Sequence, residues 1–169
     1  MSRKILFRGK HIHAMDSNEH LNGTWVRGYL SDENHIYDKS LKGEFLIDED
    51  TICQYTGLTD KNGKKIFEGD IVRFGKNYGE VKFGLHESNW QIYKYNQGFF
   101  VKFSKVYFRN ELGFWRDKVI VTGNIYDNPE LLKCCGTCKY HQHENIDDGG
   151  VCVNSDSEYV ADWICRDSE

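Results

Sequence analysis

Four of the six cysteines are spaced as metal ligands can be. Cys135 and Cys138 form a C-x2-C pair, Cys152 follows after thirteen residues and Cys165 after a further twelve. Two thiolates from a tight knuckle and two from separate points can enclose a tetrahedral Zn2+ ion, and this small segment has too few large apolar residues to build its own core. We therefore expect a structural zinc site in which four protein ligands leave no open position for catalysis. The expected ligands are Cys135, Cys138, Cys152 and Cys165.

The spacing also leaves two alternatives open. The distal half of the segment lacks a second C-x2-C pair, and Cys134, His141 and His143 offer competing ligands. Without zinc, the segment is expected to pack its few apolar side chains on the rest of the protein, with its thiols free or paired as disulfides. A reducing cytoplasm favours free thiols over disulfides.

Other residues with chemical potential do not form a recognisable catalytic set. Cys53 has no histidine base near it in the sequence, so a buried core thiol is expected. His11 and His13 alternate as strand residues do and are expected on a solvated face, with metal binding as the alternative. The chain contains neither a G-x4-GK[ST] phosphate loop nor a G-x-S-x-G elbow. We expect no enzymatic activity.

Length and charge restrict the architecture and the partners. With 169 residues the chain can bury one ordinary core and carry a small appended module. Residues 134–169 hold two basic and eight acidic residues, so the net charge of −4 leaves the rest only weakly basic, too weakly to predict duplex binding. No run of about 18 apolar residues and no secretory signal is present, so we expect a protein of the cytoplasm.

The pattern of short apolar runs and polar turns predicts antiparallel strands. Asn62-Gly63 is a strong turn signal, Asn96-Gln97-Gly98 is expected to be another turn, and Asn128-Pro129 is expected to start a short helix. The predicted fold is mainly β: a small antiparallel barrel-like domain with a short helix over residues 1–132, and an acidic, zinc-knuckle-like module over residues 133–169. The expected strands cover residues 5–8, 25–30, 70–74, 80–83, 119–122 and parts of 90–108.

Three sequence strings resemble those of a known family. QYTGLTDKNGKKIFEGDIV spans residues 54–72, GNIYDNPEL spans 123–131, and ILFRG spans 5–9. Together they closely resemble the signature of YopX-type phage proteins over about residues 1–132. The resemblance implies a barrel-like β domain able to form homo-oligomers, and no established reaction or ligand.

Two groups of residues are candidate binding sites. Polar residues of the signature can form a shared edge or pocket, although most of the signature also fits a role in turns and core: Gln54, Tyr55, Thr56, Asp60 and Asp70. The aromatic stretch 90–108 is interleaved with lysines and can stack single-stranded bases, although core packing or an oligomer interface explains it as well. Its candidate residues are Trp90, Tyr93, Lys94 and Lys102.

These observations favour a non-enzymatic phage accessory protein in the host bacterial cytoplasm. Its expected partner is a host protein, with inhibition of an antiphage defence system as one outcome of binding. Two alternatives are a module that binds single-stranded nucleic acid and a sponge that traps a small nucleotide signal.

Overall fold

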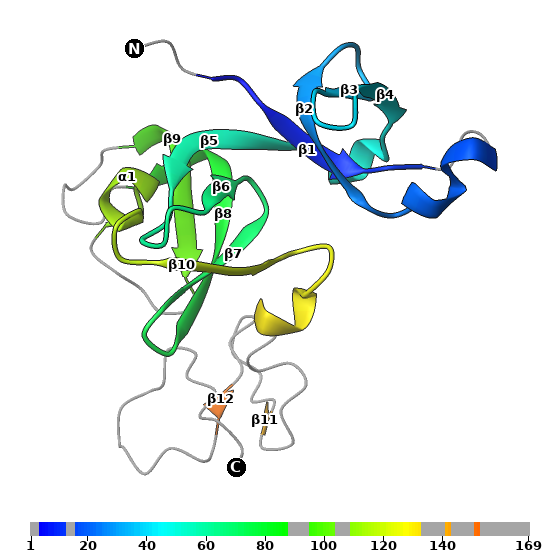
Figure 1. Cartoon of the computed structure of the whole chain (residues 1–169). Helices are drawn as coiled ribbons and strands as arrows, with labels where there is room; N and C mark the ends of the chain where they lie inside the picture. Colours follow the sequence, from blue (N-terminus) through cyan, green and yellow to red (C-terminus); the bar gives the residue numbers. More distant parts are fainter. Residues whose placement is uncertain are drawn as a thin grey trace. The chain divides into compact units, whose positions relative to one another are not determined.

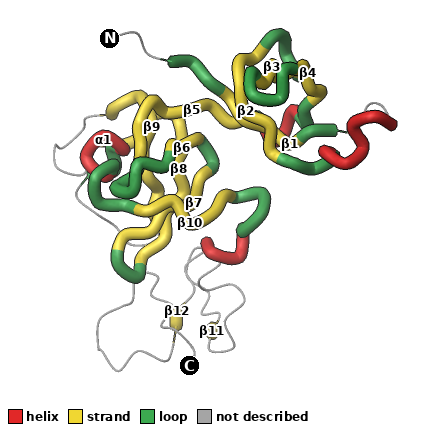
Figure 2. Tube along the Cα trace, viewed as in Figure 1, coloured by secondary structure: helices red, strands yellow, loops and turns green. Residues whose placement is uncertain are grey.

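A computed structural model describes residues 4–12, 16–87, 95–103, 109–132, 141–142 and 151–152. The chain divides into two compact units, Met1–Gly69 and Asp70–Glu169, which we call the first and second units. Figure 1 labels their elements, and Figure 2 shows that the described parts are mostly strand and loop. No helix in these ranges is long and apolar enough to cross a membrane.

The first unit contains one sheet of six strands in the order β4-β3-β2-β1-β5-β6. All neighbouring strands are antiparallel. The strands are β1 (Phe7–Lys10), β2 (Trp25–Leu30), β3 (His35–Asp38), β4 (Gly43–Leu46), β5 (Cys53–Thr59) and β6 (Lys65–Phe67), with 3-10 segments at Asp16–Leu21 and Glu49–Thr51.

Alternation along β2 to β4 separates an inner from an outer face. The inner face supplies the fully buried core residues Val26, Ile36 and Ile47, together with Phe45, on which half-buried apolar side chains pack. Gly28 lies in β2, two residues after Val26. Because it has no side chain, it allows β2 to approach β3 closely. Period-two burial of this kind fixes the register, because a slip by one residue would expose the whole apolar set.

The β5–β6 hairpin confirms the turn predicted at Asn62-Gly63. Asp60 N–H donates to the Lys64 carbonyl oxygen at 2.8 Å, and the Asp60 carboxylate accepts from the backbone N–H groups of Asn62 and Lys64 at 2.9 Å each. Gly63 has φ of +81°, a conformation that suits glycine. Local turn chemistry is therefore sufficient to place this hairpin.

The second unit contains a four-stranded antiparallel sheet in the order β10-β7-β8-β9. Its core includes Val72, Val81 and Val101, all fully buried, with Leu112 and Trp115 from the single described α-helix. The elements are β7 (Asp70–Phe74), β8 (Asn77–Glu87), β9 (Tyr95–Phe103), α1 (Leu112–Trp115), β10 (Ile120–Asn124) and a 3-10 segment at Pro129–Leu132; β11 (His141–Gln142) and β12 (Val151–Cys152) form a separate pair.

The mainly β, antiparallel prediction is confirmed, but the barrel prediction is wrong. The described strands form separate open sheets, since β6 belongs to one sheet and the next strand, β7, begins another after Gly69. The predicted turn at residues 96–98 is also wrong, because β9 continues through it in nine paired positions with β8. The short helix expected at Pro129 is a 3-10 segment. The boundary placed after residue 132 stays a prediction.

Candidate binding surfaces

Three polar residues of the signature, Tyr55, Thr56 and Asp60, serve the β5–β6 hairpin. Thr56 Oγ1 donates to the Ile66 carbonyl oxygen at 2.8 Å, and the Tyr55 ring lies 5.4 Å from that of Phe67. All three are buried, and the Asp60 carboxylate accepts from the turn. Their described contacts are those of a scaffold, because hydrogen bonds to backbone groups hold the hairpin together.

The other two signature candidates lie on strand ends in different units. Gln54 is half-buried opposite Phe7, and its carbonyl oxygen accepts from Glu68 N–H at 2.9 Å. Asp70 opens β7 in the second unit, is 1% exposed and pairs in register with Asn124. The pocket that the sequence suggested for this group stays a prediction.

Of the candidates in the aromatic stretch, Lys102 alone lies within the described residues. It is exposed on β9, directly opposite Glu80, which forms an ion pair with Lys82 at 3.4 Å. Trp90, Tyr93 and Lys94 lie outside the described residues.

Most of the expected zinc site also falls outside the described part of the chain. Cys135, Cys138 and Cys165 are not described, and Cys152 is placed only as backbone in β12. Within the described ranges, no three histidine, cysteine, aspartate or glutamate side chains form a metal-binding group. Cys53 is 2% exposed and its Sγ lies 3.3 Å from the Thr51 carbonyl oxygen, as expected for a core thiol.

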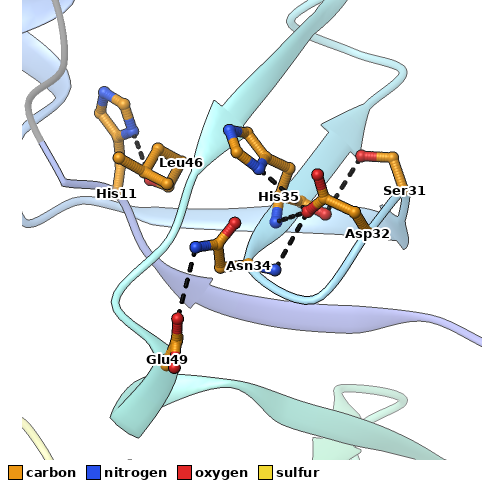
Figure 3. Close-up of polar contacts among 7 residues, drawn as sticks. All are labelled: His11, Ser31, Asp32, Asn34, His35, Leu46 and Glu49. Atoms are coloured by element: carbon orange, nitrogen blue, oxygen red, sulfur yellow. Dashed lines mark hydrogen bonds and ion pairs between the residues drawn. The ribbon is translucent and has the colours of Figure 1, made fainter.

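The β2–β3 turn brings together a serine, an aspartate and a histidine (Figure 3). His35 Nδ1 lies 2.9 Å from Asp32 Oδ1, but the Ser31 hydroxyl donates to the His35 carbonyl oxygen rather than to the imidazole. The Asp32 carboxylate also accepts from Asn34 and His35 N–H. The hydrogen bond from Asn34 N–H has the largest effect on the pKa of Asp32. Together with the hydrogen bonds and the charge of nearby His35, it holds that pKa below its ordinary value. The geometry is that of a capped turn, since a nucleophilic serine needs its base within reach.

Two histidines among the described residues are buried, one against the expectation from the sequence and one for which no expectation came from the sequence. His11 is 1% exposed, and its Nδ1 lies 2.9 Å from the Leu46 carbonyl oxygen, so the solvated face expected for it is wrong (Figure 3). His13 is not described. His86 is 7% exposed and stacks on Phe100 with ring centroids 4.7 Å apart. Single histidines in polar stretches gave no sequence signal for burial.

Large aromatic or aliphatic side chains are exposed on a sheet face in each unit. In the first unit, Tyr29 and Tyr37 face each other across β2 and β3 and are 51% and 43% exposed. In the second unit, Phe83 and Leu85 of β8 are 50% and 67% exposed. Exposed apolar side chains that lie together on a sheet face are candidate contact sites for other macromolecules.

The comparison with protein families is consistent with the signature strings. The chain matches the YopX protein family over residues 7–133, and it belongs to that family. No curated protein matches it.

Proposed function

We propose that the chain is a non-enzymatic phage accessory protein that binds a host protein in the bacterial cytoplasm. Its contact surface is an apolar group on one side of the β8–β9 ribbon, toward the Glu87–Tyr95 pair, which we call the ribbon face: Phe83, Leu85, Tyr95 and Phe99. Phe83, Leu85 and Tyr95 are 50%, 67% and 60% exposed, and their exposure beside half-buried Phe99 is the observation that carries the proposal.

The register of β8 and β9 places these four side chains on one side of the ribbon. Phe83 pairs with Phe99, and their rings meet edge to face with centroids 5.0 Å apart. Val81 and Val101, one alternation further along the same face, are fully buried in the core. The same side of the ribbon is therefore buried at Val81 and Val101 and exposed further along, at the ribbon face.

The composition of the ribbon face suits a protein partner. Its four side chains are aromatic or aliphatic, and the centres of protein interfaces are depleted in charged residues. On the same side of the ribbon, Gln97 lies opposite Leu85, and Glu87 lies opposite Tyr95 at the last pair. Exposed clusters of this kind are otherwise a liability for aggregation, which supports a role in binding. In this proposal the partner is a component of an antiphage defence system, and the family membership supports the phage context.

Native mass spectrometry of the protein purified from infected cells tests this function. The expected species is a stoichiometric complex with one host protein, whose affinity falls about 30-fold or more in Leu85→Asp, as for truncation of an interface hot spot. Leu41→Ser is the matched control, because Leu41 is 50% exposed in the first unit. On a host that carries the defence system, the wild type and the control should restore phage plating, whereas Leu85→Asp should not.

Other species would point to other functions. A nucleotide that co-purifies in place of a protein would support a sponge and overturn the proposal. A homo-oligomer that Leu85→Asp converts to monomer, with no host protein bound, would assign the ribbon face to self-association instead.

A further inference from the structure

The outer face of the first sheet combines aromatic and basic side chains in rows set by strand pairing. Lys10 of β1 lies opposite Trp25 of β2, and Arg8 lies opposite Arg27. One step further, Tyr29 pairs with Tyr37 of β3. Figure 1 shows β1, β2 and β3 side by side. Because paired residues project to the same side of a sheet, three aromatic rings and three cations share this face, which we call the outer face.

Buried contacts hold one end of the outer face in place. The Arg8 guanidinium is 7% exposed and lies between two rings, 4.8 Å from the centroid of Trp25 and 4.9 Å from that of Phe67. Its Nη2 donates to the Glu68 carbonyl oxygen at 3.3 Å. Lys10 Nζ lies 5.7 Å from the Trp25 ring. Trp25 is therefore fixed before any ligand arrives, which lowers the entropy cost of binding.

The other end of the outer face is open. Tyr29 and Tyr37 are about half exposed, and the Arg27 side chain is exposed between Tyr29 and Trp25. Side chains at alternate positions of β2 are about 7 Å apart, and Tyr37 is about 5 Å from Tyr29 across the strands. A flexible ligand that carries successive planar rings can therefore stack on these aromatic side chains one after another.

Local charge on the outer face is positive although the unit is not. Residues 1–69 carry ten lysines and arginines against eleven aspartates and glutamates. In the paired rows of the outer face, the three cations are accompanied by one carboxylate, Glu44, opposite Tyr37. Because exposed charges are screened beyond about 8 Å at physiological salt, a ligand on this face meets mainly the cations.

We infer that the outer face binds single-stranded nucleic acid. Trp25, Tyr29 and Tyr37 stack on bases, and Lys10 and Arg27 contact phosphates between them. Aromatic rings interleaved with cations on an open sheet suit this ligand, because every base offers a face for stacking and every nucleotide a charge. A duplex is excluded as the ligand, since its bases are stacked on each other. The inference concerns a different unit from the ribbon face and does not depend on the proposed host partner.

Salt titration of the full chain against a fluorescently labelled oligo-dT tests the inference. Two phosphate contacts give a slope of log K against log salt of about −1.4 for a single strand, and Arg27→Gln should reduce it to about −0.7. Arg116→Gln is the matched control, because the Arg116 side chain is 48% exposed in the second unit, and it should keep the wild-type slope.

Stacking is tested separately with Tyr37→Leu. This variant should weaken oligo-dT binding about fivefold or more with little change in slope, whereas Phe114→Leu, at a 39% exposed ring of the second unit, should bind as the wild type does. No oligo-dT binding at low salt, equal binding of a duplex, or equal binding by Tyr37→Leu would each overturn the inference. So would a preference for poly-glutamate over oligo-dT, which would assign the outer face to an acidic polypeptide.

Discussion

Replacing Gly28 by alanine should force β2 and β3 apart. A Cβ atom at Gly28 would lie 1.9 Å from the Tyr37 carbonyl oxygen and 2.7 Å from its carbonyl carbon. Both atoms are backbone, so they cannot rotate away, and the strands would have to separate by about 1.5 Å to reach ordinary contact. That displacement would stretch a hydrogen bond such as Ser31 N–H to the His35 carbonyl oxygen, now 2.9 Å, beyond bonding range.

The expected loss of stability follows from the backbone hydrogen bonds between β2 and β3. Two or three backbone hydrogen bonds at about 1 kcal/mol each lower the free energy of unfolding by about 2 to 3 kcal/mol. Urea unfolding followed by circular dichroism should show a midpoint about 1 M lower. Gly113→Ala is the control, since no atom lies within 4 Å of its added Cβ. A Gly28→Ala midpoint equal to that of the wild type would refute the close approach of β2 to β3.

Further predictions concern single residues of the turns, the core and the cysteine segment. Asp38→Ala should cost about 1 to 3 kcal/mol, measured by urea unfolding, because its carboxylate accepts from the Ser40 hydroxyl and backbone. Burial raises the pKa of Asp38, but these hydrogen bonds outweigh burial and hold the pKa below its ordinary value. Their stabilisation is therefore present above the ordinary aspartate pKa of about 4, is lost as the pH falls through the lower folded-state pKa, and should be missing from Asp38→Ala in acid titrations. Ile66→Ala, at a fully buried side chain, should cost about 2 to 5 kcal/mol and lower the Tm in calorimetry. Gly63→Ala should cost about 1 to 2 kcal/mol in the same urea assay because φ is +81° there. Elemental analysis should find one Zn2+ per chain and a loss of it in Cys135→Ser; a wild type free of metal would contradict the zinc prediction.

Local patterns predicted the elements whose causes are local. The Asp60–Lys64 turn forms through bonds among five consecutive residues, so its sequence is enough to place it. β7 and β10 were likewise expected from their runs of β-branched residues. β3 was missed, because its four residues include one fully buried apolar side chain, Ile36, whose burial depends on Val26 and Phe45 from other strands.

The wrong turn at residues 96–98 shows the opposite case. Asn96, Gln97 and Gly98 have the composition of a turn, yet each pairs with a residue of β8. Nine consecutive pairs outweigh the preference of three residues, and Gly98 keeps an unusual φ of +155° within the strand. Tertiary pairing decided the structure here, as it often does for strands.

The candidate surfaces could not be read from proximity along the chain. Dense aromatic stretches place alternate residues on opposite faces, so Val101 is buried while its neighbour Lys102 is exposed. The aromatic side chains of the outer face, those of Trp25, Tyr29 and Tyr37, instead come from β2 and β3 and lie outside the aromatic stretch 90–108. Such a face becomes visible only when the register is known, because pairing decides which alternate positions meet. The registers between strands are therefore what could not be predicted from the sequence of this protein.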